Sequence, residues 1–189
     1  MTSDFLPPGP TSDVVLRPAR ADDLPRLGPI ERAADRRFEG TPYTVFLDGD
    51  AIPPGVAARA LADGRLTVAE RGGEVVGWLC ATRLGGEVCV GQVSVLPAHG
   101  RRGIGTALLR DLLDRARAAG EPSVVLITQA DIPWNAPWYE RHGFAIVPTS
   151  QWGDAMHAEA RRSADLDWSQ RVLMRCDLRD GLSSRSAGL

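Results

Sequence analysis

Glycine and arginine gather in one short segment, residues 100–106, whose sequence is Gly-Arg-Arg-Gly-Ile-Gly-Thr. Glycine has no Cβ, so successive backbone N–H groups in such a segment can turn toward one point. A helix that starts here adds the partial positive charge of its N-terminus, and Arg101 and Arg102 can donate charge-assisted hydrogen bonds. The chemistry that this combination favours is the binding of a phosphate or pyrophosphate group.

Two common phosphate-binding motifs do not fit this segment. A Walker loop requires Gly-Lys-Ser or Gly-Lys-Thr, which the chain lacks. A dinucleotide-binding fingerprint requires a third glycine where this chain has Leu108, and it follows the first strand of a βαβ unit rather than the hairpins expected here. A glycine-rich turn that only caps a core helix remains as the alternative without a ligand.

A second group of residues lies further along the chain, where Asn135 is followed by Trp138, Tyr139, Gly143 and Phe144. Together the two segments resemble the GNAT superfamily of N-acetyltransferases. That family has a strand ending in Val-x-Pro, a loop of the form [Gln/Arg]-x-x-Gly-x-[Gly/Ala], and later an Asn and an aromatic-Tyr-x-x-x-Gly-Phe block. The start of the chain also resembles the family's first strand and helix, so the resemblance extends over residues 14–178.

The resemblance implies acetyl-CoA as the co-substrate and requires no metal. It implies that the backbone of Val93, Ser94 and Val95 pairs with the pantetheine arm as an added strand, and that Asn135 contacts the same arm. The pyrophosphate is expected at the loop formed by Gly100, Arg101, Arg102, Gly103, Ile104, Gly105 and Thr106. The chain departs from the motif at its first position, where the family usually has Gln or Arg and this chain has Gly100. One side-chain contact is thereby lost, and Arg101 can replace it.

Tyr139 occupies the position of the family's general acid, which protonates the departing thiolate of CoA. A thiolate whose thiol has a pKa of about 8.5 leaves more easily when a hydroxyl donates a proton to it. The alternative for Tyr139 is an aromatic side chain that only packs beneath the sheet.

The general base is not evident from the motif. Many family members carry a Glu on the fourth strand, where this chain has Gly91 and Gln92, neither of which can accept a proton. Glu31, on the first helix, which borders the acceptor site in this fold, is the leading substitute. A surface carboxylate is the alternative for Glu31, and deprotonation of the amine through water would need no dedicated base.

Periodicity predicts the elements that position these residues. Strands are expected at 14–16, from 66 to a Gly-Gly turn at 72–73, at 75–82, and, after a second turn at Gly85-Gly86, at 88–96. Further strands are expected at 124–127, 144–147 and 172–176. Helices are expected from a cap at Asp22 or Asp23 through Ala34, and at 56–62, 103–119, 135–142 and 154–162. Gly91 interrupts its strand, which indicates a bulge or a close backbone approach. The predicted fold class is α/β (α+β), GNAT-like, with a mixed, mostly antiparallel sheet of six to seven strands flanked by helices.

Composition limits the class of protein. The 189 residues fit one domain, expected at 12–179, between disordered tails at 1–11 and 180–189. The net charge of −2 is spread over interspersed acidic and basic residues, which argues against a nucleic-acid partner. No apolar run is long enough to span a membrane, and the start of the chain does not read as a signal peptide. Cys80, Cys89 and Cys176 have no CxxC spacing, so they predict buried thiols in a cytoplasmic protein.

The predicted function is transfer of an acetyl (acyl) group from acetyl-CoA to a primary amine of a small molecule or peptide, by direct attack. The alternative is a catalytically inactive, acyl-CoA-binding regulatory domain, which the missing acid on the fourth strand suggests; a nucleotide-binding protein is a third reading. Between the last two strands, residues 149–169 form a connection of about 20 residues, longer than compact domains usually carry without structure. This length predicts a helical flap that walls the amine site or packs on a second subunit of a homodimer. A solvated insertion is the alternative.

Overall fold

The structure is a computed structural model of the chain, and it describes residues 13–43, 52–162 and 171–179. The predicted tails, residues 1–11 and 180–189, and residues 163–169 of the predicted flap lie outside these ranges. The strands are β1 (Val14–Pro18), β2 (Leu66–Arg71), β3 (Glu74–Leu84), β4 (Glu87–Val95), β5 (Ser123–Gln129), β6 (Ala145–Ile146) and β7 (Arg171–Asp177). The α-helices are α1 (Leu24–Asp35), α3 (Pro54–Ala62), α4 (Ile104–Ala118), α5 (Ala136–Glu140) and α6 (Asp154–Arg162).

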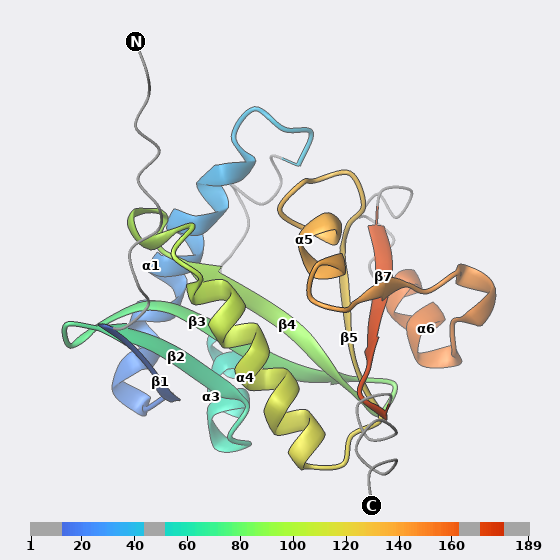
Figure 1. Ribbon diagram of the computed structural model, residues 1–189, viewed down its shortest axis with the longest axis horizontal. Helices are drawn as coiled ribbons and strands as arrows, with labels where there is room; N and C mark the ends of the chain where they lie inside the picture. The colour runs from blue at the N-terminus through green and yellow to red at the C-terminus, as the bar shows by residue number, and fades with distance from the viewer. Residues whose placement is uncertain (1–12, 44–51, 163–170, 180–189) are drawn as a thin grey trace, which may run out of the picture. The chain divides into compact units, whose positions relative to one another are not determined.

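Within the described ranges, seven strands form one sheet in the order β1-β2-β3-β4-β5-β7-β6 (Figure 1). The ladders β1–β2, β2–β3, β5–β7 and β6–β7 are antiparallel, and β4 pairs with β5 in parallel. The predicted fold class, a mixed and mostly antiparallel sheet with flanking helices, is therefore confirmed. The chain divides into two compact units: Met1–Cys80 with Gln92–Leu109 (unit 1), and Ala81–Gly91 with Arg110–Leu189 (unit 2).

The core of unit 1 is a cluster of buried side chains from α1, α3, β2 and β3. Trp78 is fully buried in it, and its indole Nε1 donates a hydrogen bond to the main-chain oxygen of Leu27 at 3.1 Å. Leu96, directly after β4, packs against the same cluster. The buried members of the cluster are Leu27, Ile30, Ala57, Ala60, Leu66, Val68, Val75, Trp78 and Cys80.

Two glycine pairs make the turns that the sequence predicts. Gly72 and Gly73, between β2 and β3, have φ of 59° and 82°, and Gly85 and Gly86, between β3 and β4, have φ of 60° and 89°. A positive φ at both central residues gives the two-residue turn whose twist matches that of the flanking strands. Glycine adopts this conformation without the steric penalty that a Cβ would add. The predicted Gly-Gly turns are confirmed.

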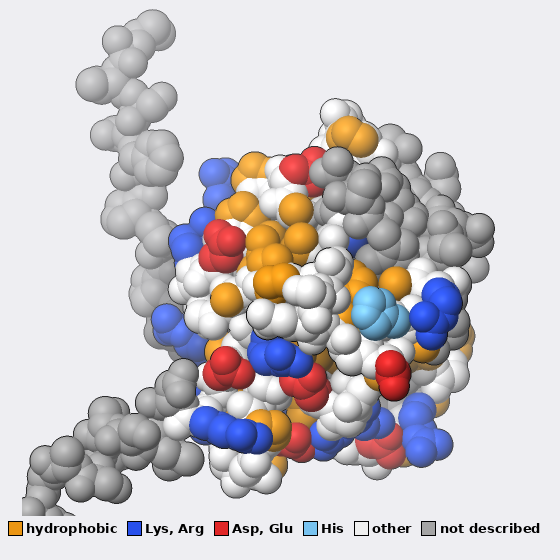
Figure 2. Space-filling model, turned by 90° about the vertical axis from the view of Figure 1, so that its right-hand side faces the viewer, with side chains coloured by type: hydrophobic (Ala, Val, Ile, Leu, Met, Phe, Trp, Pro, Cys, Tyr) orange, Lys and Arg blue, Asp and Glu red, His pale blue; other side chains and the backbone are white. Residues whose placement is uncertain are grey.

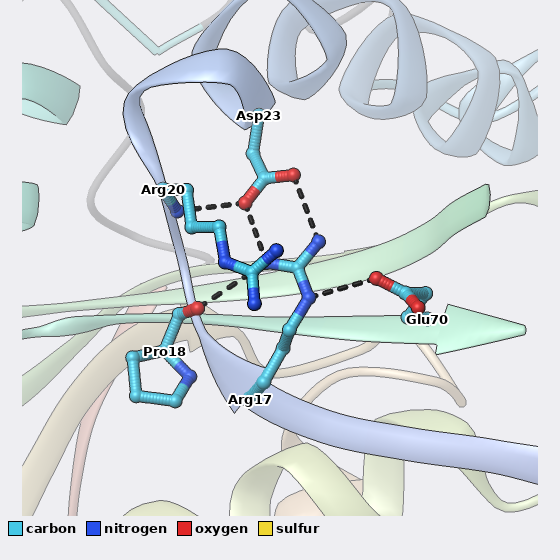
Figure 3. Close-up of polar contacts among 5 residues, drawn as sticks. All are labelled: Arg17, Pro18, Arg20, Asp23 and Glu70. Carbon is cyan, nitrogen blue, oxygen red and sulfur yellow. Dashed lines mark hydrogen bonds and ion pairs between the residues drawn. The ribbon is translucent and has the colours of Figure 1, made fainter. Parts of the chain in front are cut away.

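The predicted cap of α1 is confirmed in its position, Asp23, but not in its side-chain hydrogen bond. Asp23 occupies the capping position without a side-chain hydrogen bond to the helix, and a 3-10 turn (Ala21–Asp23) precedes it. Its carboxylate instead accepts hydrogen bonds from Arg17 at 2.7 and 3.0 Å and from the Arg20 backbone N–H at 2.7 Å (Figure 3). Arg17 also donates to Glu70 at 2.8 Å. A two-pronged, charge-assisted bond to a guanidinium is stronger than a cap to a neutral N–H, so Asp23 links β1 to the turn before α1.

Unit 2 is built around β7, which pairs with β5 on one side and with β6 on the other. Glu87, at the start of β4, accepts hydrogen bonds from Arg175 on β7 at 3.1 and 2.8 Å and from the hydroxyl of Ser123 on β5. Burial opposes ionisation of Glu87, but the bonds from Arg175 and Ser123 outweigh it and lower the pKa of this carboxyl. One carboxylate thus joins three strands of the sheet.

Two predicted elements are shorter than expected. The helix predicted at 135–142 covers Ala136–Glu140, because Asn135 has a non-helical backbone (φ −112°, ψ −111°) and Gly143 turns the chain at φ 89°. The strand predicted at 144–147 covers Ala145–Ile146. Phe144 is buried and its N–H donates to Tyr139 O at 3.2 Å, so its backbone bonds to the helix end instead of to β7.

The remaining features concern thiols, membranes and surface charge. Cys80, Cys89 and Cys176 are free and buried, as predicted, and burial raises the pKa of the Cys80 thiol to about 11. In the part of the chain that the structure describes, no helix has the length and apolar character needed to cross a bilayer. Figure 2 shows acidic and basic side chains interspersed over the face that it presents, with hydrophobic groups between them.

Candidate functional site

The glycine loop, residues 100–106, connects a 3-10 turn after β4 (Pro97–His99) to the first turn of α4. The Gly100 N–H donates to Pro97 O at 3.0 Å, and a Cβ at position 100 would lie 3.1 Å from the same oxygen. A side chain at this position would therefore crowd the Pro97 oxygen. The Gly103 oxygen accepts from Ala107 N at 2.8 Å, which places the start of the helix inside the loop.

The backbone of the glycine loop is left-handed at two positions, Arg101 (φ 56°) and Gly103 (φ 80°). A non-glycine residue in this region carries a strain of about 1–2 kcal/mol, and such strain is concentrated at functional sites. The first backbone N–H groups of a helix have no acceptor within the helix, so the first turn of α4 presents donors to a ligand. Arg101 and Arg102 are exposed, and within the described ranges neither guanidinium forms an ion pair.

The second half of β4 runs close to β3. A Cβ on Gly77 would lie 3.0 Å from Ser94 O and 3.1 Å from Val95 Cγ2, so glycine is needed on β3 at this point. A glycine inside a predicted strand is a signal of such a close backbone approach. The prediction from this signal named Gly91 and not Gly77. The side chain of Gln92 donates to the hydroxyl of the buried Ser94 at 3.1 Å.

Two carboxyl groups lie one turn apart on α1. Glu31 is buried, and one of its carboxylate oxygens accepts the Ile52 N–H at 2.7 Å. Burial raises the pKa of Glu31; the bond from Ile52 counteracts this, and the charge of Asp35 raises it further. Burial also raises the pKa of Asp35, to about 6. Asp35 was not among the predicted site residues, although its position four residues after Glu31 places both groups on one helix face.

The other predicted site residues belong to unit 2. Asn135 lies directly before α5, and its main-chain oxygen accepts from Trp138 N at 2.8 Å and from Tyr139 N at 3.0 Å. Its side-chain Nδ2 donates to Gln129 Oε1, at the end of β5, at 2.5 Å. Tyr139 is 8% exposed, and its ring contacts Trp138 and Phe144 edge-on, with centroids 4.8 and 5.6 Å apart.

The structure therefore groups the predicted residues in two sets. In unit 1, Val93, Ser94 and Val95 lead directly into the glycine loop, and the helix that carries Glu31 shares a hydrophobic cluster with Leu96 through Ile30. In unit 2, Asn135 and Tyr139 are joined by a hydrogen bond. Asp35, Gly77 and Gln129 are the neighbours of these sets that sequence analysis did not identify.

The described part of the 149–169 connection is packed and not merely solvated. Met156 of α6 is buried in a cluster with Cys89, Val125, Val147 and Leu173. The Trp152 indole donates to Val147 O at 3.1 Å, and the Ala155 Cβ lies 3.0 Å from where a Cβ on Gly85 would be. The predicted helix at 154–162 is confirmed. Its predicted role beside the amine site or a second subunit stays a prediction.

Known proteins of one family are similar to this chain. A profile of the acetyltransferase (GNAT) family matches residues 30–144. The chain is 37% identical over 97 residues to the N-alpha-acetyltransferase RimI of Mycobacterium tuberculosis, an alignment that covers 48% of this chain and 61% of that protein. The chain thus spans less than two thirds of the length of this curated relative.

Solved structures show the same fold. A GNAT family acetyltransferase from Brucella melitensis, in complex with acetyl-CoA, has 28% identity and a TM-score of 0.52, over 70% of this chain and 82% of its own. N-acetylglutamate synthase from Neisseria gonorrhoeae, complexed with coenzyme A and N-acetyl-glutamate, has 15% identity and a TM-score of 0.63, over 88% of this chain and 35% of its own. The family profile covers more than half of the sequence and includes the whole glycine loop. The chain belongs to the acetyltransferase (GNAT) family.

Proposed function

We propose that the protein transfers an acetyl group from acetyl-CoA to a primary amine by direct attack of the amine on the thioester. The observation that carries the proposal is the glycine loop, in which left-handed Arg101 and Gly103 lead into the N-terminus of α4. This geometry suits an anion with several oxygen atoms, because donors from the backbone and from two guanidinium groups are available at one place. The pyrophosphate of CoA is such an anion.

The strand before the loop fits the role of cofactor partner. The parallel ladder between β4 and β5 consists of Val88 with Val124 and Cys89 with Val125, and so ends before Val93. We propose that the backbone of Val93, Ser94 and Val95 pairs with the amides of the pantetheine arm, as an added strand would. Asn135 is proposed to contact the same arm. Acetyl-CoA supplies the activated acetyl group, and the protein supplies its position.

The departing sulfur needs a proton donor. We assign this role to Tyr139, which is largely buried, so that water competes little with its hydroxyl. In the reaction a C–N bond forms and the C–S bond breaks, and the tyrosine proton goes to the sulfur as the thiolate departs. General acid–base groups of this kind contribute about 10²- to 10⁴-fold to the rate.

The incoming amine must lose a proton before or during attack. Glu31 is the proposed base, and Asp35 is a second carboxylate on the same helix face. Both groups are partly or largely removed from water, which raises their pKa and makes them better proton acceptors than exposed carboxylates. Two acidic groups on one face also favour a substrate that arrives as an ammonium ion.

The acceptor class is inferred from relatives. One similar protein is named an N-alpha-acetyltransferase, and another makes N-acetylglutamate. We therefore propose an α-amine, carried by a peptide or by a small molecule such as an amino acid, as the acceptor. A homodimer stays a prediction from the family.

A second function, an inactive acyl-CoA-binding regulatory domain, is favoured by one observation. Gln92 stands where many family members carry an acid, and its amide is engaged with Ser94. The two functions differ in a single measurable property. A regulatory domain binds acetyl-CoA without releasing CoA in the presence of any amine.

The deciding experiment measures release of CoA thiol from acetyl-CoA with a panel of amino acids, peptides and polyamines. The sequence contains no lysine. No side-chain amine of the protein itself can therefore be acetylated and release CoA as a background. Release that depends on one class of amine supports the transferase. Tight binding without release across the panel would favour the regulatory domain.

A binding measurement tests the glycine loop itself. Gly103→Glu places a bulky acidic side chain at φ 80° in the loop, and Gly86→Glu places the same residue at φ 89° in the β3–β4 turn. The two variants share the backbone strain, but only the first lies in the proposed pyrophosphate site. We expect Gly103→Glu to abolish acetyl-CoA binding and Gly86→Glu to retain it. Equal affinities in both variants would remove the loop from the site.

A further inference from the structure

The side chains of the buried Gln129 and the half-buried Asn135 form a hydrogen-bonded pair of amides in unit 2. Gln129 is the last residue of β5 and is 5% exposed, and Asn135 is the residue before α5. The Asn135 Nδ2 donates to Gln129 Oε1 at 2.5 Å, a short contact for two neutral amides. A polar side chain this deeply buried destabilises the fold unless it is bonded, so the pair is a specific connection between β5 and α5.

The backbone of Asn135 is in an unusual conformation. Its φ of −112° and ψ of −111° lie outside the helical and extended regions. Such a conformation persists only where neighbouring bonds determine it. Here the Asn135 N–H donates to Ile132 O at 2.9 Å, and the side-chain bond to Gln129 fixes the same residue from the side of the sheet.

Asn135 also determines where Tyr139 lies. The Asn135 oxygen accepts the N–H groups of Trp138 at 2.8 Å and of Tyr139 at 3.0 Å. α5 is a short helix, Ala136–Glu140, so few other bonds along the helix can restore its direction if this end moves. A rotation of the Asn135 peptide therefore shifts Tyr139 directly.

We propose that Gln129 is a positioning residue for the reaction: through its hydrogen bond to Asn135 it fixes the first turn of α5 and thereby the hydroxyl of Tyr139. This inference rests on the proposed role of Tyr139 as the proton donor. The connection from Gln129 to Tyr139 consists of the side-chain bond to Asn135 and the backbone bond from Tyr139 N to Asn135 O. Gln129 therefore needs no contact with the reacting atoms. Sub-ångström errors in such a donor reduce turnover without abolishing the fold.

Two substitutions at position 129 separate the hydrogen bond from the volume of the side chain. Gln129→Met keeps the length of the side chain and removes the accepting oxygen. Gln129→Glu keeps an accepting oxygen whether or not the carboxyl is protonated. We expect Gln129→Met to lower kcat by about tenfold, the factor that corresponds to one hydrogen bond of ordinary net strength, and Gln129→Glu to recover most of the loss. An equal loss in both variants would show that packing at this position, and not the bond, matters.

A double-mutant cycle then tests whether Gln129 acts through Tyr139. In a Tyr139→Phe background no hydroxyl remains to be positioned, so adding Gln129→Met is expected to change kcat by less than about twofold. A further tenfold loss in that background would overturn the inference, because Gln129 would then act independently of the hydroxyl. Unchanged kcat in Tyr139→Phe alone would also overturn it, while leaving acetyl transfer itself in place.

Amide hydrogen exchange gives a test that needs no turnover. The amide protons of Trp138 and Tyr139 bond to Asn135 O, so Gln129→Met is expected to speed their exchange by about tenfold, with the β5–β7 ladder unaffected. Unchanged exchange at both amides would show that Gln129 does not fix this turn. If the wild-type protein released no CoA with any amine, the proposed function would fail, and the exchange measurement would still decide whether the amide pair orders α5.

Discussion

Trp78 on β3 and Leu27 on α1 are joined by a hydrogen bond from the indole Nε1 to the main-chain oxygen, 3.1 Å long, across 51 residues of sequence. Both residues are buried, so the bond and the ring together attach the helix that carries Glu31 to the sheet. Trp78→Phe removes the donor and leaves a cavity, and we expect it to lower the free energy of unfolding by about 2–4 kcal/mol. Urea unfolding measures this. Val15→Ala, at a side chain 61% exposed, is the control, and an equal change in both variants would contradict the assignment.

Gly77, on β3, leaves no room for a Cβ against the proposed pantetheine strand. Gly77→Ala forces its Cβ to within 3.0 Å of Ser94 O, so we expect a loss of about 1–3 kcal/mol and weaker acetyl-CoA binding. Gly55→Ala is the matched control, because nothing lies within 4 Å of a Cβ there. We expect the control to be neutral or slightly stabilising, since alanine favours a helix. Calorimetric titration of both variants with CoA would detect the difference, and equal affinity would show that the strand tolerates the shift.

The acid stability of the protein should depend on Asp23. The bond from Arg17 lowers the pKa of this carboxyl below its ordinary 3.8, so its stabilising contribution is complete at neutral pH and is lost as the pH falls through the lowered value. Asp23→Asn should therefore destabilise the protein at pH 7 by about 2 kcal/mol, with a difference that narrows as the pH falls below the ordinary 3.8 and through the lowered value. Asp22→Asn, at an exposed neighbour, is the control. A gap between Asp23→Asn and wild type that does not change with pH would contradict the ion-pair explanation.

The Asp35 carboxyl should change the pH dependence of stability in the opposite direction to Asp23. Burial raises its folded-state pKa to about 6, against 3.8 for the ordinary group, so the native state takes up a proton between these values and gains stability as the pH falls. Asp35→Asn is always uncharged, and we expect it to stabilise the protein at pH 7 by up to about 3 kcal/mol, with the gain vanishing toward pH 4. Thermal unfolding at several pH values would measure the difference. Destabilisation at pH 7 would show that the charged carboxylate has a partner that stabilises it.

The choice of base can be made from pH–rate profiles. Glu31→Gln keeps an oxygen that can accept the Ile52 N–H, so the fold should survive while the proton acceptor is lost. We expect kcat/KM to fall by about 10²- to 10⁴-fold and the acidic limb of the profile to disappear. Asp35→Asn serves as the comparison, because it removes the other carboxylate on the same face. A wild-type profile in Glu31→Gln and a lost limb in Asp35→Asn would transfer the role to Asp35.

Local patterns in the sequence predicted most of the fold. The four-residue repeat of Ile104, Leu108, Leu112 and Ala116 predicted α4, and all four side chains are buried. The Gly-Gly turns were also predictable, because few other residues adopt positive φ at two successive positions. Elements whose own periodicity determines them were thus located within a few residues.

The features that were missed depend on contacts between distant segments. Asp23 is the N-cap residue of α1, but its carboxylate does not bond the helix because Arg17, on another element, binds it more strongly than a helix N–H does. The raised pKa of Asp35 depends on burial that no local pattern expresses. The bond between Gln129 and Asn135 spans a loop, and a Gln and an Asn at that spacing form no recognisable sequence motif.

The position of β7 in the sheet has a consequence for the order of folding. Arg171–Asp177 lies between β5 and β6, although both of those strands precede it in the chain. Until this segment has been synthesised, β5 has an open edge, Ala145–Ile146 has no partner, and Glu87 lacks the guanidinium of Arg175. Unit 2 therefore has to complete its sheet by inserting a late strand between two earlier ones, a non-local step of the kind that slows folding and exposes strand edges to other chains. Premature termination before residue 171 should accordingly yield an aggregating chain rather than a smaller enzyme.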